Sequence, residues 1–141
     1  MSPATRPAGE DGPVPSPRCP CGTGLVLDEC CGRLHEGTST AATAEQLMRS
    51  RYSAFALGRR DHLLATWHST TRPRTLDLDP ALRWTGLDVV AGSGGGLLDR
   101  DGFVEFIAHY VAPGRTGAQH ERSRFAREGG RWRYVDGLSL S

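Results

Sequence analysis

The sequence predicts a small α+β domain in which two helices lead into an antiparallel sheet, preceded by a compact metal-binding segment. Apolar residues recur at helical spacing between residues 43 and 58. From residue 83 onward, segments rich in strand-forming side chains alternate with glycine-containing turns. All four cysteines lie in one short N-terminal stretch, residues 19–31. A chain of 141 residues accommodates one domain and a small appendage.

The N-terminal segment differs in composition from the rest of the chain. Residues 1–17 contain five prolines and two glycines. Such a segment cannot bury enough apolar surface to offset the entropy lost on ordering. We therefore expect residues 1–17 to be a disordered tail, residues 18–37 to form the cysteine-bearing segment, and residues 43–141 to form the α+β domain.

The cysteines form two close pairs, Cys19 with Cys21 and Cys30 with Cys31. Four thiolates complete a tetrahedral zinc site and leave no position open for a substrate. Two disulfides are the rival interpretation, in which Cys30 and Cys31 would each join one of the other two, because a bond between neighbours strains the backbone. Free thiols that bind no metal are a third interpretation.

We favour zinc because of the compartment that the sequence indicates. Residues 1–10 hold no apolar run that would serve as a secretory signal. No stretch is long and apolar enough to span a membrane. Thiols stay reduced in the cytosol and are free to bind metal there. The sequence therefore predicts a cytoplasmic protein with no membrane contact.

Two helices are expected next. Thr43 followed by Gln46 forms a capping-box pattern that begins the first helix. Gly58 follows the last apolar position, where a left-handed residue ends a helix. The second helix is expected from Asp61 to about His68, because Pro73 prevents it from continuing much further. The inward face of the first helix comprises Leu47, Met48, Tyr52, Phe55 and Ala56.

The remainder predicts an antiparallel meander. Strands are expected at residues 83–91, 103–111, 118–127 and 131–135. Residues 128–130 form a hairpin turn between the last two. Alternation along the third strand places Glu121, Ser123 and Phe125 on one face, which we expect to point inward.

Charge and glycine content argue against nucleic-acid and nucleotide binding. The net charge is +1, and all seventeen basic residues are arginine while lysine and asparagine are absent. This pattern suggests a GC-rich coding sequence, so arginine clusters carry little functional weight. The glycine-rich residues 92–96 precede a strand rather than a helix, whereas a phosphate-binding loop needs a helix N-terminus. We expect a flexible connection between strands there.

Several segments resemble known families. The cysteine segment resembles the SEC-C zinc motif, found at the C-terminus of the SecA translocase and in many small bacterial proteins. Residues 44–55, 66–68, 71–73, 120–125, 130–132 and 136–137 resemble the YchJ family. The resemblance covers about residues 18–138.

The resemblance implies both fold and ligands. The central domain is similar to the nuclear transport factor 2-like (NTF2-like) fold, a cone of bent sheet closed by helices. The resemblance also implies zinc at Cys19, Cys21, Cys30 and Cys31, which match the cysteines of the motif one by one. Cys31 stands where SecA-type motifs have histidine, which leaves His35 free of the metal. The stretch Leu25–Glu29 lacks the lysines and aromatic residue of many SEC-C motifs, so docking on the same acidic chaperone surface is not implied.

The interior of such a cone often forms a small-molecule pocket, and five residues are candidates to line it. Glu121 is the first, because a carboxyl in a partly apolar cavity has a raised pKa, as a general base requires. The alternative is a structural carboxylate bonded to an arginine or a tyrosine. Trp67, His68 and Arg72 lie where the second helix ends, either at the pocket mouth or as core and helix cap. Tyr52 is a further candidate, although core packing also accounts for it.

Two functions are consistent with these features. The first is a protein-interaction adaptor, in which the zinc-bearing segment docks a partner protein through Leu25, Val26 and Leu27. Three apolar residues on so small a module are not expected to be fully buried by its own core. The alternative is a small-molecule binder or enzyme that uses the cone, with Glu121 as acid/base. No nucleophile triad or open metal site supports catalysis, and the sequence leaves the oligomeric state open.

Overall fold

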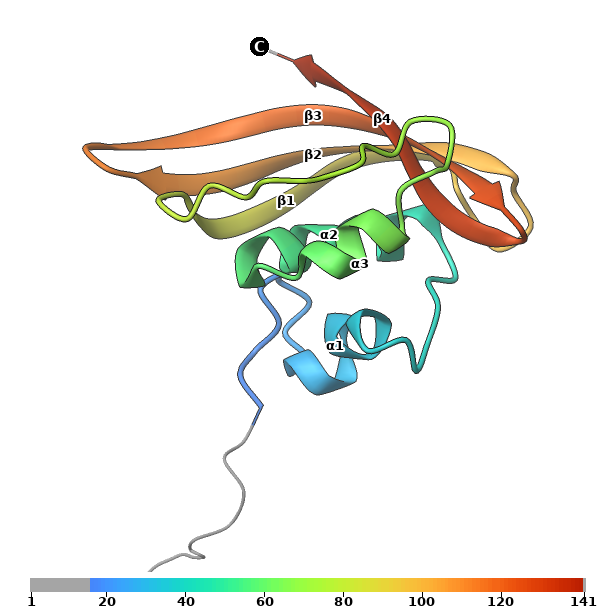
Figure 1. Ribbon diagram of the computed structural model, residues 1–141, viewed down its shortest axis with the longest axis horizontal. Coiled ribbons are helices and arrows are strands. Elements are labelled where there is room, and N and C mark those ends of the chain that lie inside the picture. The colour runs from blue at the N-terminus through green and yellow to red at the C-terminus, as the bar shows by residue number, and fades with distance from the viewer. Residues whose placement is uncertain (1–15, 141) are drawn as a thin grey trace, which may run out of the picture.

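The computed structural model describes residues 16–140, in which helices α2 and α3 pack on one antiparallel sheet and the cysteine segment with α1 lies on the far side of α2 (Figure 1). The helical elements are η1 (Leu27–Glu29), α1 (Cys31–His35), α2 (Ala44–Leu57) and α3 (Arg60–Ala65). The strands are β1 (Arg83–Gly94), β2 (Asp101–Ala112), β3 (Arg115–Glu128) and β4 (Arg131–Leu140). The predicted α+β class is confirmed.

The predicted disordered tail falls almost entirely on residues 1–15, outside the described residues. Its last two residues are described and belong to the cysteine segment. The carbonyl of Pro17 accepts a hydrogen bond from the Leu27 amide at 2.7 Å, and the Ser16 hydroxyl accepts one from the Asp28 amide at 3.2 Å. No helix within residues 16–140 has the length and apolar character needed to cross a membrane.

The four strands pair in sequence order, each antiparallel to the next. The predicted hairpin turn is present and is one residue shorter than expected: Glu128 pairs with Arg131, which leaves Gly129 and Gly130 as the turn. Both glycines have positive φ, 61° and 82°, as the favoured two-residue turns require. A register shift between Arg124 and Phe125 bends the β3–β4 pair, as an extra residue in a ladder does.

The strands are longer than the sequence indicated, and one prediction is wrong. Residues 92–94 belong to β1 and pair with β2, so the glycine-rich run is not wholly a flexible connection. Close packing explains the glycines: a Cβ on Gly102 would lie 2.4 Å from the Gly95 nitrogen. The Gly95 carbonyl also accepts a hydrogen bond from the Ala44 amide at 2.9 Å, which joins this turn to the start of α2.

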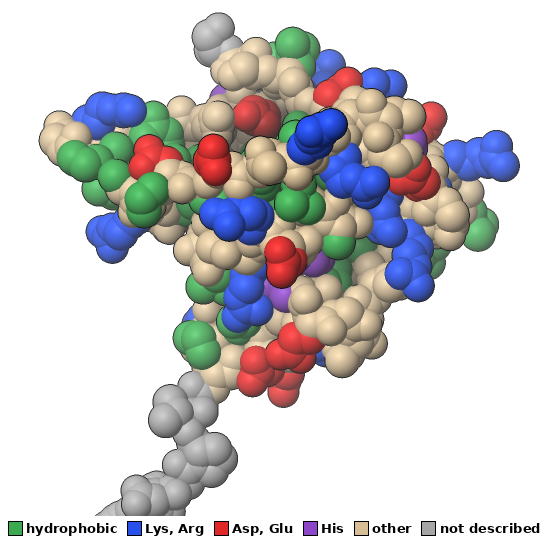
Figure 2. Space-filling view, in the orientation of Figure 1, with side chains coloured by type: hydrophobic (Ala, Val, Ile, Leu, Met, Phe, Trp, Pro, Cys, Tyr) green, Lys and Arg blue, Asp and Glu red, His purple; other side chains and the backbone are tan. Residues whose placement is uncertain are grey.

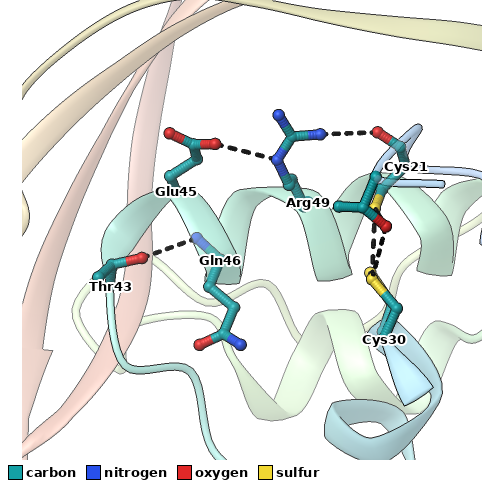
Figure 3. Close-up of polar contacts among 8 residues, drawn as sticks. Cys21, Cys30, Thr43, Glu45, Gln46 and Arg49 are labelled. Carbon is teal, nitrogen blue, oxygen red and sulfur yellow. Dashed lines mark hydrogen bonds and ion pairs between the residues drawn. The ribbon is translucent and has the colours of Figure 1, made fainter. Parts of the chain in front are cut away.

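Helix α2 begins and ends as predicted. The Thr43 hydroxyl accepts a hydrogen bond from the Gln46 amide at 3.1 Å (Figure 3), and Gly58 ends the helix in the left-handed conformation with φ 74°. Helix α3 ends at Ala65, three residues earlier than expected. The chain leaves the helix because residues 66–68 join β4: the amide of Tyr134 donates to Thr66 and that of His68 donates to Tyr134, both at 2.8 Å.

The core lies between α2 and the sheet. One cluster combines residues of α2 with the inner faces of three strands. Its buried members are Ala44, Leu47, Met48, Val104, Phe125 and Trp132. The Trp132 indole N–H donates to the Ala42 carbonyl at 3.1 Å, so a large buried side chain also has its polar group satisfied. The opposite face of α2 meets the cysteine segment and α1 (Figure 1).

Charged side chains of both signs are interspersed over the face shown in Figure 2. On the outer side of the sheet, cross-strand pairs join His120 to Glu105 at 2.7 Å and Arg124 to Asp136 at 2.9 Å. Such exposed pairs contribute little to stability individually. This outer face therefore carries solvated charge, and the apolar groups that organise the domain lie on the inner face.

Two histidines lie in the contact between α1, α2 and α3. His62 is buried, with its Nε2 2.9 Å from the Ser50 hydroxyl. Nε2 of His35 donates to the Ser50 carbonyl at 2.8 Å, and the two rings lie 4.6 Å apart. Burial, reinforced by the nearby His35 and Arg51, lowers the pKa of His62 from 6.5 to about 3. Burial also lowers the pKa of His35. Both rings are therefore neutral at pH 7.

The buried His62 predicts a loss of stability in mild acid. The unfolded chain binds a proton below pH 6.5 and the folded protein does not, so stability is lost as the pH falls from 6.5 towards 3. Between pH 7.5 and 5.5 this contribution is about 1.4 kcal/mol. Urea unfolding should show that the free energy of unfolding falls less between pH 7.5 and 5.5 for His62→Gln than for wild type, by about that amount. His109→Gln, which alters a half-exposed histidine, is the control and should keep the wild-type change. Equal changes in wild type and His62→Gln would contradict the prediction.

Candidate functional site

The four cysteine sulfurs converge on one point. Cys19 and Cys21 lie in the loop before η1, and Cys30 and Cys31 lie at the start of α1. Their Sγ atoms are all within 4.8 Å of one another. The loop reverses through Gly22 and Gly24, both with φ 88°, a left-handed conformation that side chains other than glycine rarely adopt. These two glycines let the loop bring Cys19 and Cys21 towards Cys30 and Cys31.

The spacing of the sulfurs fits a tetrahedral ion. Zinc–sulfur bonds of about 2.3 Å place sulfurs roughly 3.8 Å apart along each edge of a tetrahedron. The Cys21–Cys30 and Cys30–Cys31 separations are 3.7 and 4.0 Å. All four cysteines are free, so the disulfide interpretation finds no support in this geometry. The donor set is therefore suited to a metal ion.

The protonation of the cluster also favours a cation. Hydrogen bonds from Cys21 and Cys31 hold the pKa of the Cys19 thiol far below its usual range. The hydrogen bond to Cys19 is the largest cause of the raised pKa of Cys31. Several uncompensated negative charges cannot be buried so close together, so deprotonation of all four thiols requires a cation among them. His35 is engaged with Ser50 and is not among the clustered ligands.

The cysteine cluster is attached to the domain through α2. The Cys19 sulfur lies 3.4 Å from the Ser53 hydroxyl, and the Arg49 guanidinium donates to the Cys21 carbonyl at 2.8 Å. Figure 3 shows Arg49 held between Cys21 and Glu45, whose carboxylate accepts from Arg49 Nε at 3.0 Å. Arg49 and Ser53 are four residues apart, so both lie on the same side of the helix.

A cavity of about 500 Å³ lies between α2 and the sheet. Its floor is largely buried and its rim contains exposed residues such as Asp79, Arg115 and Gln119, so it reaches solvent. Residues 79 and 82, in the segment between α3 and β1, also line it. The apolar part of the lining is mainly aromatic and comprises Tyr52, Phe55, Trp67, Trp84, Phe106, Tyr110 and Phe125.

Polar oxygen atoms gather at one wall of the cavity. The carboxyl of Glu121 and the hydroxyls of Ser123 and Tyr134 all surround Gly137, where an added Cβ would lie 3.2 to 3.3 Å from each of them. Burial raises the pKa of Glu121. Burial also raises the pKa of Tyr134. No salt bridge to Glu121 is formed within residues 16–140.

Three of the five predicted pocket residues line the cavity, namely Tyr52, Trp67 and Glu121. The other two do not. Nδ1 of His68 accepts hydrogen bonds from Thr70, and Arg72 is exposed. The early end of α3 explains the difference, because the chain turns away along β4 before these residues reach the cavity.

The three predicted partner-contact residues differ in their exposure to solvent. Leu25 is 49% exposed and Val26 is partly buried. Leu27 is buried against the cysteine cluster, Tyr52 and Ala108, so it is not available at the surface. Leu27 therefore helps to attach the cysteine segment to the domain and does not form part of an exposed contact surface.

Sequence reasoning missed Arg51, which lines the cavity and is buried. Arg51 lies on the inward side of the expected helix, four residues after Leu47 and three after Met48, and the arginine-rich composition removed any reason to single it out. The available signal was this position, because an arginine among the apolar positions of a helix faces the same side as they do.

Comparison with known proteins gives the family. Residues 43–137 match the family model of the YchJ middle NTF2-like domain. The chain belongs to the YchJ family. Among curated relatives, the UPF0225 protein of Streptomyces coelicolor is 52% identical over 127 residues, which cover 90% of this chain and 99% of the relative. The UPF0225 protein of Chromobacterium violaceum is also 52% identical, over 85% of this chain and 91% of the relative.

Solved structures show the same fold. The solution structure of a SEC-C motif containing protein from Rhodopseudomonas palustris is 36% identical, with a TM-score of 0.76, over 87% of this chain and 98% of that one. The crystal structure of a SEC-C motif containing protein from Psychrobacter arcticus is 30% identical, with a TM-score of 0.71, over 87% of this chain and 82% of that one. The predicted NTF2-like fold and YchJ resemblance are confirmed.

Proposed function

We propose that this YchJ-family protein binds a small molecule in the cavity of its NTF2-like domain and that a structural zinc ion braces the helix forming the cavity floor. The observation that carries the proposal is the open cavity of about 500 Å³, aromatic over much of its wall, with Glu121 in its lining. A pocket of this size and composition is typical of small-molecule sites. A filled interior would have favoured a purely adaptor role.

Binding is better supported than turnover. No histidine lines the described cavity, and Ser123, its one lining serine, has no hydrogen bond to a histidine within residues 16–140. Ser123 lies near the Glu121 carboxyl but forms no hydrogen bond with it in the described residues, so the serine is not held as an activated nucleophile. Glu121 is the candidate acid/base for any reaction on the bound molecule, because its raised pKa suits proton transfer.

The zinc part of the proposal rests on the closed sulfur set. Cys19, Cys21, Cys30 and Cys31 would supply all four ligands, as in structural sites. The ion would neutralise their thiolates and hold the cysteine segment against α2. Tyr52 lies in the same buried cluster as Cys19 and Cys21 and also lines the cavity, so the brace supports the cavity directly. Free thiols ready for metal suit the reducing cytoplasm, where we place the protein.

Metal analysis tests the brace. Protein purified under reducing conditions should contain one zinc ion per chain, and Cys30→Ser should contain almost none and melt at a lower temperature, because the metal binds only the folded state. Glu29→Gln, which changes an exposed neighbour with no sulfur, should keep both zinc and melting temperature. Wild-type protein free of zinc, or a zinc content unaffected by Cys30→Ser, would disprove the brace.

A neutral aromatic probe tests the cavity. For 2-naphthol, a compound of about eleven non-hydrogen atoms, we expect binding on the order of 0.1–1 mM, at roughly 0.4 kcal/mol per atom. Gln119→Trp, at the cavity rim, should weaken binding about fivefold or more by filling space. Arg122→Trp, on the outer face of the same strand, is the matched control. Calorimetry and NMR shifts at Phe106 and Tyr110 report the binding; shifts confined to other residues would refute it.

A second candidate function, docking of a partner protein by the cysteine segment, is favoured by one observation. Leu25 is half exposed beside a shallow hollow that Thr23, Cys30 and Arg33 also line. With Val26 beside it, Leu25 offers a small apolar contact on a segment that zinc would hold rigid.

A lysate capture experiment tests this second function. Leu25→Asp should reduce recovery of a specific partner about tenfold if Leu25 is the contact. Leu98→Asp is the matched control, because Leu98 is as apolar and more exposed but lies on the β1–β2 turn. Equal recovery with wild type and Leu25→Asp would exclude docking through this residue.

A further inference from the structure

Arg51 is a cation buried in the wall of the cavity. Its side chain projects from α2, and the residue is only 5% exposed. One terminal nitrogen donates to the Leu63 carbonyl at 2.7 Å and to the Thr66 hydroxyl at 2.8 Å. The guanidinium carbon lies 4.9 Å from the centre of the Trp67 ring and 4.4 Å from that of Tyr134. The group is therefore held between two aromatic rings in a fixed position.

This cation has no anionic partner in the described part of the chain. Within residues 16–140, no carboxylate forms a salt bridge with Arg51, and its Nε and second terminal nitrogen have no hydrogen-bond acceptor. Burial lowers its pKa to about 9, which still leaves it protonated at pH 7. A buried charge is costly unless it is paired, so an arginine in this position is suited to an anion from outside the chain.

An independent observation points to the same place. The indole nitrogen of Trp67 is buried and has no hydrogen-bond partner among the described residues. Buried indole N–H groups normally find an acceptor. Trp67 lines the same cavity as Arg51 and stacks on its guanidinium. A buried indole N–H without an acceptor therefore lies beside the buried cation, and both residues line the cavity.

We propose, as an extension of the proposed small-molecule function, that the cavity binds an organic carboxylate, whose oxygens accept hydrogen bonds from Arg51 and the Trp67 indole. The apolar body of the ligand then packs against the aromatic wall formed by Phe55, Trp84 and Phe106. Arginine and carboxylate match in geometry, because the planar guanidinium presents paired donors to paired acceptors.

The charge of the cavity restricts the ligand to one negative charge. Arg51 is its single buried cation, and the other lining arginine, Arg115, lies exposed at the rim. A phosphate monoester carries nearly two negative charges and would leave one uncompensated among aromatic side chains. Glu121 on the neighbouring wall disfavours a dianion further whenever its carboxyl is ionised. A monocarboxylate with an aromatic or aliphatic body satisfies both constraints.

A pair of probes with the same shape tests the proposal on the zinc-loaded full chain. The probes are 2-naphthoate and its neutral amide, 2-naphthamide, measured by calorimetry at pH 7. Because hydrogen bonds to a charged group are roughly twice as strong as neutral ones, we expect naphthoate to bind about tenfold more tightly or better. Equal affinity for the two probes would overturn carboxylate recognition while leaving the small-molecule function intact. Failure of both probes and of 2-naphthol would overturn the small-molecule function and this extension together.

Substitutions test whether Arg51 and Trp67 cause the preference for naphthoate over naphthamide. Arg51→Gln should remove the preference for naphthoate, and Trp67→Phe, which keeps an aromatic ring but lacks the N–H, should reduce it several-fold. Arg60→Gln, which removes an exposed cation from α3 outside the cavity, should keep it. Preference lost in Arg115→Gln and kept in Arg51→Gln would overturn the assignment to the buried arginine. If Arg51→Gln fails to fold, the wild-type probe pair and Trp67→Phe decide, and an unchanged preference in Trp67→Phe counts against the proposal.

Discussion

Burial of α2 on two opposite sides is the constraint on which the structure depends. One side of the helix packs against the sheet through Leu47 and Met48, and the other holds the cysteine segment through Arg49 and Ser53. A helix buried on two opposite sides needs partners for the polar groups on those sides, and the buried Ser50, Arg51 and Ser53 each have at least one specific contact. Loss of either layer would expose one side of this helix, so the small cysteine segment is an integral part of the domain.

The same helix connects the cysteine cluster with the cavity. Tyr52 touches the cysteine cluster and also forms part of the cavity floor, and Ala108 of β2 does the same from the sheet. Closed sulfur sites contribute rigidity rather than chemistry. Arg51 and Glu121 are the charged groups of the cavity, and they lie on α2 and β3. A metal ion bound by the cysteines would hold α2 in place from the side opposite the sheet. Such preorganisation reduces the entropic cost of binding a small ligand.

Much of the fold was predictable from local patterns. Thr43 and Gly58 marked both ends of α2 because caps depend on a few neighbouring residues. Alternation placed Glu121, Ser123 and Phe125 on the inner face of β3, as the structure confirms. The end of α3 was wrong because a contact with β4, more than sixty residues away in sequence, removes the last turn of that helix. The burial of His62 was not predictable from its neighbours in sequence, because its partner, Ser50, lies on a different helix.

The sequence by itself determined the α+β class, the grouping of the four cysteines and the inward face of β3, because each follows from spacing along the backbone. Tertiary structure alone decided that a cavity remains open, that Arg51 and Trp67 meet in its wall, and that His68 and Arg72 lie outside it. Those outcomes depend on how helices and strands approach one another, and therefore on the sum of many weak contacts between residues distant in sequence. A pattern of residue types predicts which side of a helix or strand is buried, and it does not predict which residues that side will contact.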